Sequence, residues 1–191
     1  NFVGIHNRKY CDGGQCIRLY KTFMKKKDPE AANIVMGHNE EDLLGLGTIF
    51  SLLAYKKLYD GEYHPKQCVI LEQELKIVIE LSAAAPVNVS CGNSDFYLSV
   101  NGYEARMLVH LKEGKLRQYY RNYKDYEFIP GEDTAMPKSI TRYMDKSLKI
   151  ATTPQTCYTW FNCDEDFLNN EKKQMQYLTH TLPFFLDNLN K

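Results

Sequence analysis

The chain has 191 residues, of which 43% are hydrophobic and 25% are charged, and its 24 basic residues balance its 24 acidic ones. This length and composition predict a single globular domain with a substantial core. A net charge of zero gives no overall field toward nucleic acid, and no apolar run is long enough for a membrane span. We therefore expect no nucleic-acid partner and no membrane span.

The N-terminal part of the chain has little regular pattern, and residues 1–38 predict an irregular arm. Asn39 then has the properties of a helix N-cap, because acidic residues 40–42 follow in the first turn, where the helix dipole favours them. Apolar residues recur at helical spacing after this point. The stretch 43–59 nevertheless admits a helix, a strand, or one followed by the other.

Alternating apolar residues predict antiparallel strands in the middle of the chain. Period two runs over residues 71–81 and again over 96–100. Asn101-Gly102 lies between two such runs and predicts a type I′ hairpin. An aromatic run over residues 116–129 predicts a further long strand. The consecutive tight turns indicate a meander of about six to eight strands.

Residues 164–191 predict an amphipathic C-terminal helix, since apolar residues recur every three or four positions from Leu168 to Leu189. The fold class is therefore α+β or mainly β: an antiparallel β-meander that forms a barrel or a strongly curved sheet, with an N-terminal and a C-terminal helix. The helix and meander occupy residues 39–161.

An even number of well-separated cysteines predicts three disulfides in an oxidising compartment. No metal site is expected, because the close pairs have four and five residues between them and the five histidines are scattered. The spacing leaves all 15 pairings open. The six cysteines are Cys11, Cys16, Cys68, Cys91, Cys157 and Cys163.

Two further features favour secretion. Asn88-Val89-Ser90 is an N-glycosylation sequon, so Asn88 is a candidate glycosylation site. The chain begins at Asn1 without Met, which is expected of a mature chain after removal of a signal peptide, or of an artificial boundary. We expect a secreted, extracellular glycoprotein.

Catalytic signatures are absent from the sequence, which has no nucleophile elbow, no phosphate-binding glycine loop, no dinucleotide fingerprint and no His-Glu-x-x-His pair. The acidic triplet at residues 164–166 is explained by its place at a helix start. We therefore expect a binding protein with no catalytic residues and no cofactor. The 14 Tyr and nine Phe predict core packing, a pocket or an interface.

The order of elements resembles the lipocalin family, especially the arthropod salivary type. The similar stretch has Ile49-Phe50-Ser51-Leu52-Leu53-Ala54-Tyr55 as a first strand, Cys68-Val69 entering the second, and Ile150-Ala151 before Cys157 as a late strand. The family's Gly-x-Trp of the first strand is missing, and few residues follow Cys157. The resemblance implies a barrel that encloses a small ligand.

A helix followed by an antiparallel meander is also similar to a cystatin-type fold. The glutamine-valine-x-valine-glycine loop and the proline-tryptophan hairpin of inhibitory cystatins are absent from the sequence. Inhibition of cysteine proteases is therefore not implied by this second resemblance.

The leading expectation is a carrier or scavenger of a small apolar or amphipathic ligand. The alternative is a protein-binding module, such as an immune modulator, inhibitor or signalling ligand, that acts through a tyrosine-rich surface. Candidate ligand-binding residues lie on the apolar faces of the clearest strands: Phe96, Leu98, Tyr103, Met107, Tyr120, Phe128 and Trp160.

Overall fold

The computed structural model describes residues 9, 10 and 12–189. The chain divides into two compact units, with the division between Leu53 and Ala54, although the composition favoured a single domain. The two units are described separately below.

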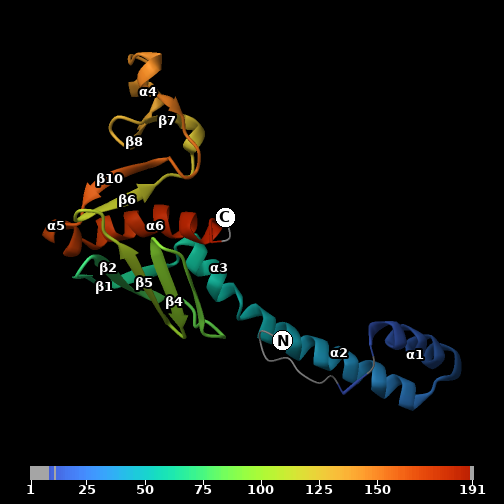
Figure 1. The fold of residues 1–191 in the computed structure, drawn as a ribbon. Helices are drawn as coiled ribbons and strands as arrows, with labels where there is room; N and C mark the ends of the chain where they lie inside the picture. Colours follow the sequence, from blue (N-terminus) through green and yellow to red (C-terminus); the bar gives the residue numbers. More distant parts are fainter. Residues whose placement is uncertain (1–8, 11, 190–191) are drawn as a thin grey trace. The chain divides into compact units, whose positions relative to one another are not determined.

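The first unit contains two helices that lie side by side, α1 (Gly13–Lys26) and α2 (Pro29–Phe50) (Figure 1). The carboxylate of Asp12 caps α1 by accepting from the Gln15 amide, at 2.9 Å, and Asp28 caps α2 before Pro29. The expected irregular arm over residues 1–38 is therefore wrong from residue 13 onward. Two aspartate N-caps favour helix here in spite of the paired glycines at the start of α1.

The stretch 43–59, which the sequence left open, is helical. It includes the end of α2 and most of α3 (Leu53–Asp60), which buries Ala54 and Leu58. The first lipocalin strand expected at residues 49–55 is thus replaced by helix and a short turn. The chain leaves α3 through Gly61, whose φ of +88° is open to glycine without strain.

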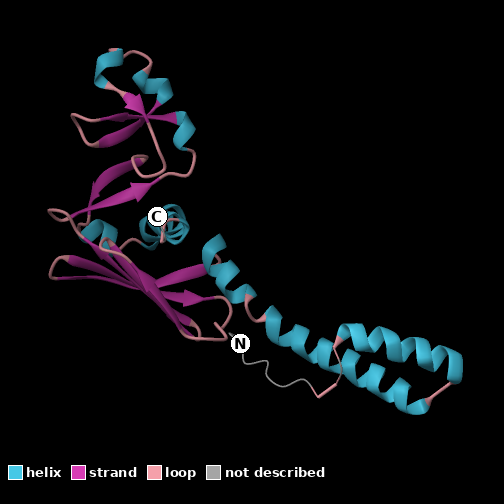
Figure 2. Cartoon of the chain, turned by 45° about the vertical axis from the view of Figure 1, so that its right-hand side comes forward, coloured by secondary structure: helices cyan, strands magenta, loops and turns pink. Residues whose placement is uncertain are grey.

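The second unit contains a five-stranded antiparallel sheet, whose strands are magenta in Figure 2. The strand order is β1-β2-β5-β4-β3. The alternation predicted for residues 71–81 and 96–100 is confirmed over β2 and β4, although Leu71 ends β1 and residues 72–73 form a turn. The predicted hairpin joins β4 to β5, but its turn residues are Gly102 (φ +55°) and Tyr103, because Asn101 pairs with Glu104. The predicted type I′ turn at Asn101-Gly102 is therefore wrong by one residue. The strands are β1 (Tyr63–Leu71), β2 (Glu74–Leu81), β3 (Val89–Gly92), β4 (Phe96–Asn101) and β5 (Glu104–His110).

A β-bulge interrupts the pairing of β1 with β2. Pro65 lies opposite Ile79 and Gln67 lies opposite Val78, so Lys66 is the additional residue. After the bulge Cys68 lies opposite Ile77, which is fully buried. The bulge therefore puts Cys68 on the same core-facing side as Tyr63 and Pro65, while Ile70 and Leu71 at the end of β1 are exposed.

The remaining strands form two small sheets. β6 (Lys115–Tyr119) pairs with β10 (Tyr158–Asn162), while β7 (Tyr126–Ile129) lies between β8 (Thr134–Pro137) and β9 (Ile150–Ala151). The single long strand predicted over residues 116–129 is wrong, because the chain changes sheets through the 3₁₀ turn η1 (Tyr123–Asp125). Two short helical turns, α4 (Lys138–Thr141) and η2 (Lys146–Leu148), connect β8 to β9.

The predicted C-terminal helix is confirmed as α5 (Glu165–Leu168) and α6 (Glu171–Asp187), and α6 continues through Pro183. In both views α6 lies between the five-stranded sheet and the β6–β10 pair (Figure 1). Phe185 stacks on Phe96 of the sheet with ring centres 4.1 Å apart, and Phe184 stacks on Tyr119 of β6 at 3.7 Å. These contacts join both layers into one core.

The fold is mixed α+β, with antiparallel sheets and helices at both ends of the chain. Among the described residues β1 and β3 remain the edges of the larger sheet, so closure into a barrel stays a prediction. Each helix in the described part of the chain is too short or too polar to span a membrane.

Candidate functional site

The structure does not bring the predicted ligand-binding residues together. Phe96, Leu98 and Met107 are buried in the core beneath α6, and Met107 has no exposed surface. Tyr103 lies in the hairpin turn and is 65% exposed. These four residues therefore do not share a ligand cavity.

The other three predicted residues lie near the β6–β10 pair. Tyr120 stacks on Tyr126 at 5.2 Å and contacts the Thr159 hydroxyl at 3.0 Å, while Phe128 meets the edge of Tyr158. Trp160 alone lines a cleft. The tyrosine-rich segment 119–126 is thus mostly packed within the unit, and the tyrosines most exposed in the second unit are Tyr97, Tyr103 and Tyr143.

The residue that organises the cleft is Arg117 on β6. The strand register places Arg117 directly opposite Trp160 of β10. The centre of its guanidinium lies 4.7 Å from the ring centre of Tyr158 and 4.6 Å from that of Trp160. Cation–π contact with both rings holds the planar guanidinium in one orientation. Its Nε is buried and meets no hydrogen-bond partner among the described residues.

Asp133 positions the two aromatic residues that hold Arg117. It lies in the turn between β7 and β8 with a φ of +49°. Its carboxylate accepts a hydrogen bond from the Tyr158 hydroxyl, and its carbonyl oxygen accepts from the Trp160 indole nitrogen at 2.9 Å. One turn residue therefore fixes both rings.

The cleft beside Arg117 has a volume of about 250 Å³. Its apolar floor comes from β5, β6 and α6, and its rim carries two cations, Lys112 and Arg117, with Asp95 as the one lining carboxylate. The lining residues are Asp95, Val109, His110, Lys112, Arg117, Tyr119, Trp160 and Phe185. A neighbouring hollow of about 360 Å³ shares Lys112 and Trp160 with it.

Electrostatics keep the guanidinium charged. Burial lowers the pKa of Arg117, but Tyr119 and the carboxylate of Asp133 outweigh this effect and raise the pKa above its ordinary value. Burial also raises the pKa of Tyr158 to about 12, helped by its hydrogen bond to Asp133. The cleft therefore offers a permanent cation and neutral phenols, an arrangement that binds an anion with an attached ring or apolar body.

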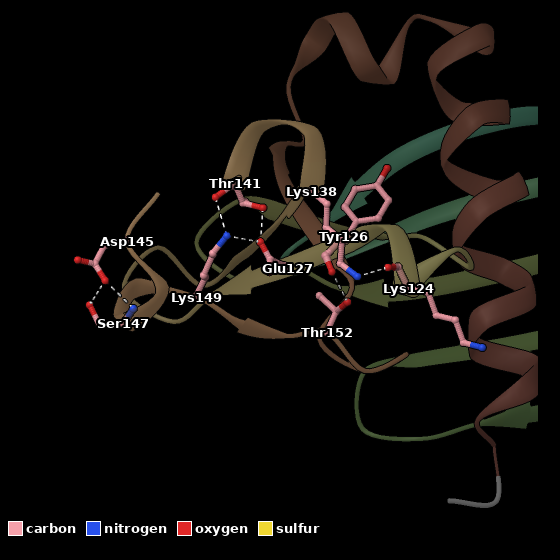
Figure 3. Close-up of polar contacts among 9 residues, drawn as sticks. All are labelled: Lys124, Tyr126, Glu127, Lys138, Thr141, Asp145, Ser147, Lys149 and Thr152. Carbon is pink, nitrogen blue, oxygen red and sulfur yellow. Dashed lines mark hydrogen bonds and ion pairs between the residues drawn. The ribbon is translucent and has the colours of Figure 1, made fainter. Parts of the chain in front are cut away.

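A second polar cluster lies around β7 and β9 and is shown in Figure 3. Lys149 forms an ion pair with Glu127 at 2.8 Å and donates to the Thr141 carbonyl at 2.7 Å, while the Thr141 hydroxyl donates to Glu127. The hydrogen bonds from Lys149 and then Thr141 lower the pKa of Glu127. Each of these groups is satisfied by the others, so we assign this cluster to holding α4 against β7.

Four of the predicted disulfide cysteines are thiols in the second unit, where the structure joins none of them: Cys68, Cys91, Cys157 and Cys163. Burial raises the pKa of the Cys68 thiol to about 12 and those of Cys157 and Cys163 to about 11. Cys16 lies on α1, and Cys11 lies outside the described residues. The three disulfides stay a prediction.

The candidate glycosylation site, Asn88, is exposed just before β3. It lines a hollow of about 510 Å³ on the outer face of the sheet, together with Ser90, Ser99 and Arg106. This hollow is larger than the Arg117 cleft, but its walls are mostly polar and it contains no aromatic side chain. Asn88 is therefore accessible to modification.

In the first unit His38 of α2 is buried and its Nε2 lies 3.3 Å from the carboxylate of Asp42, one helical turn later. The nearby Glu41 accepts from the Lys9 amide at 2.8 Å, which ties the preceding segment to α2. Within residues 9, 10 and 12–189 no group of three His, Cys, Asp or Glu side chains is placed to hold a metal ion.

Comparison with known proteins gives one similarity. Residues 1–54 match a sequence model of the RNase_H superfamily. No curated protein and no solved structure matches the chain. The match covers the first unit and the His38–Asp42 pair, whereas the Arg117 cleft belongs to the second unit.

Proposed function

We propose that the chain is a nucleic-acid-binding protein whose second unit holds single-stranded RNA at the Arg117 cleft. The observation that carries the proposal is the guanidinium of Arg117, which contacts the rings of both Tyr158 and Trp160 beside a cleft with an apolar floor. A guanidinium fixed in this way presents its N–H groups to a phosphate, while the aromatic wall offers a surface for a base.

Lys112 supplies a second cation for the nucleic-acid backbone. Its ammonium lies 5.6 Å from the ring centre of Trp160, and the side chain is exposed. It can therefore swing toward a phosphate and leave the indole to stack on a base. Recognition of single strands by stacking tolerates different sequences, so we expect little sequence preference.

The RNase_H superfamily match supports the same class of ligand, because that superfamily is named for ribonucleases. The net charge of zero argued against nucleic acid at the level of the whole chain. Local cations act over about 8–10 Å at ordinary salt, so a neutral chain can still bind a phosphate at one site. The proposal is limited to binding.

The test measures fluorescence anisotropy of a labelled oligouridylate with the wild-type chain, Arg117→Gln and Arg106→Gln. Arg106 is the matched control, since it is an exposed arginine on β5 whose loss changes the net charge equally. We expect Arg117→Gln to weaken binding about tenfold, as loss of one stacked or phosphate contact does, and Arg106→Gln to change it less than twofold.

Salt dependence provides a second readout. Two phosphate contacts, from Arg117 and Lys112, predict a slope of about −1.4 in the logarithm of affinity against the logarithm of salt concentration. Equal losses in the two arginine variants, or no binding by the wild-type chain at low salt, would contradict the proposal.

A second candidate function is the carrier expected from the sequence: a secreted, lipocalin-like protein for a small amphipathic ligand, with the larger sheet as part of a barrel or strongly curved sheet. The apolar floor of the Arg117 cleft, formed by Val109, Tyr119 and Phe185, favours it, since a carboxylate could pair with Arg117 above that floor. Native mass spectrometry of protein from a secreting eukaryotic host tests this function. Excess mass that disappears on denaturation would support the carrier.

A further inference from the structure

Two thiols far apart in the sequence lie on the same side of the core in the second unit. Cys68 lies on β1, where the bulge turns it to the face of the buried Ile77. That face is covered by α6, because β1 packs against this helix. The side chain of Cys68 is half-buried against the core cluster.

Cys163 joins the same core cluster from the layer formed by β6 and β10. It directly follows β10, its amide donates to the Gly114 carbonyl at 2.9 Å, and its side chain is buried in the core cluster. It lies between Phe161 and Phe167 in the sequence, and the rings of both lie within 6 Å of the Tyr177 ring. Tyr177 belongs to α6 and is fully buried.

Tyr177 thus contacts the segment that contains Cys163, and it belongs to the helix that β1 packs against. Its pKa is raised first by burial and then by neighbours that include both Cys163 and Cys68. The pKa of Cys68 is likewise raised by burial and then by Cys163. By contrast, Cys91 lies on β3 at the opposite edge of the five-stranded sheet from Cys68, with β2, β5 and β4 between the two thiols.

We propose that Cys68 and Cys163 are a disulfide-forming pair that links β1 to the end of β10 across the core. This selects one of the 15 pairings that the spacing leaves open. The reaction takes two electrons and two protons from the thiols, forms one S–S bond, and reduces a small-molecule disulfide such as oxidised glutathione to two thiols.

The timing of this reaction follows from burial. Only the thiolate attacks a disulfide, and in the folded chain both thiols have pKa values of about 11 to 12, so the thiolate fraction at neutral pH is very small. We expect slow oxidation of the folded, reduced protein. The bond forms readily while the chain folds and the thiols are still exposed.

The test uses the full chain with two cysteines at a time. One variant keeps Cys68 and Cys163, and the control keeps Cys68 and Cys91, with the other four cysteines replaced by Ala in each. Both are unfolded, refolded in a mixture of reduced and oxidised glutathione, and analysed by intact mass and free-thiol titration. We expect the first variant to remain a monomer, with a mass lower by two hydrogen atoms and no free thiol. We expect most of the control variant to keep both free thiols.

The wild-type chain refolded in the same mixture is digested under non-reducing conditions. The peptides that contain Cys68 and Cys163 should be recovered as one linked species. A link from Cys68 to another cysteine, equal closure of the two variants, or two thiols that only take up glutathione would overturn the pairing. The wild-type digest decides the question if the alanine variants do not fold.

Discussion

Asp133 has an effect at the Arg117 cleft without lining it. Its carboxylate and carbonyl oxygen hold Tyr158 and Trp160, and these two rings hold Arg117. A residue in a turn thereby determines the direction in which a cation points on a different sheet. Such a residue is a positioning residue, and its removal should change both stability and binding.

We expect Asp133→Ala to lower the free energy of unfolding by about 1–3 kcal/mol, because the partly buried Tyr158 hydroxyl loses its acceptor. Glu132→Ala, in the same turn and exposed, is the control and should change stability by less than about 0.5 kcal/mol. Guanidinium unfolding of both variants measures the difference. If the two variants unfold at the same denaturant concentration, Asp133 does not hold the rings.

Sequence reasoning found one member of this site. Trp160 was selected from an apolar strand face, and the structure places it in the cleft. Arg117 and Asp133 were missed because their roles depend on the register of β6 with β10 and on a turn from a third strand pair. Four aromatic or basic residues within residues 117–121 were visible in the sequence, but nothing in a linear pattern shows which of them contact other residues.

Among the elements, β1 best shows how one inserted residue changes a whole strand. The bulge at Lys66 allows Tyr63 and Pro65 before it, and Cys68 after it, to share the core face. With strict alternation and no bulge, either Cys68 or the pair Tyr63 and Pro65 would face solvent. The missing period of two across the bulge is also why alternation did not predict β1, and only the lipocalin resemblance implied a strand here, entered at Cys68-Val69.

Deletion of Lys66 should therefore be far more harmful than its substitution. Without the extra residue Tyr63, now 2% exposed, would be turned away from the core, at a cost of about 2–3 kcal/mol. Lys66→Ala removes only an exposed ion pair with Glu80 and should cost less than about 1 kcal/mol. Urea unfolding of both variants checks this, and a deletion as mild as the substitution would show that β1 can slip without penalty.

The best-predicted elements are those whose sequence pattern lies in residues close together in the chain. Alternation, turn chemistry and helical spacing predicted β2, β4, the hairpin between β4 and β5, and α6, although the hairpin turn lies one residue later than expected. In the first unit α1 was missed because paired glycines begin it. The N-cap predicted at Asn39 was wrong, because Asp28 caps α2 and Asn39 lies inside that helix. The 116–129 segment was misjudged because sheet membership is decided by partners distant in the chain.

At the scale of the molecule, the core of the second unit contains several groups that must stay protonated. The pKa values of Cys68, Cys163 and Tyr158 in the folded chain lie at about 11 to 12, above the values near 9 and 10 expected in the unfolded chain. The folded state then binds more protons than the unfolded state above about pH 9. The contribution of these protonated groups to the free energy of unfolding is therefore fully present below pH 9 and is lost as the pH rises toward 12.

We expect the free energy of unfolding of the reduced protein to fall by roughly 2 kcal/mol between pH 7.5 and pH 10, after allowance for the partial exposure of Cys68. Urea unfolding with a reductant at the two pH values measures this fall. The fall should be smaller in the oxidised protein, where the linked Cys68 and Cys163 no longer titrate. A reduced protein with equal stability at both pH values would contradict the burial of these thiols.

The place of Trp160 has a practical consequence for optical spectroscopy. The chain contains one tryptophan, and its indole lies beside two cations at the cleft proposed to bind RNA. Any tryptophan emission from this protein therefore originates at that cleft, and the other aromatic residues contribute only the bluer emission of tyrosine and phenylalanine. Binding of a ligand at the cleft should therefore change the wavelength or the intensity of tryptophan emission. Occupancy of the cleft can then be measured without a label on the protein or the ligand.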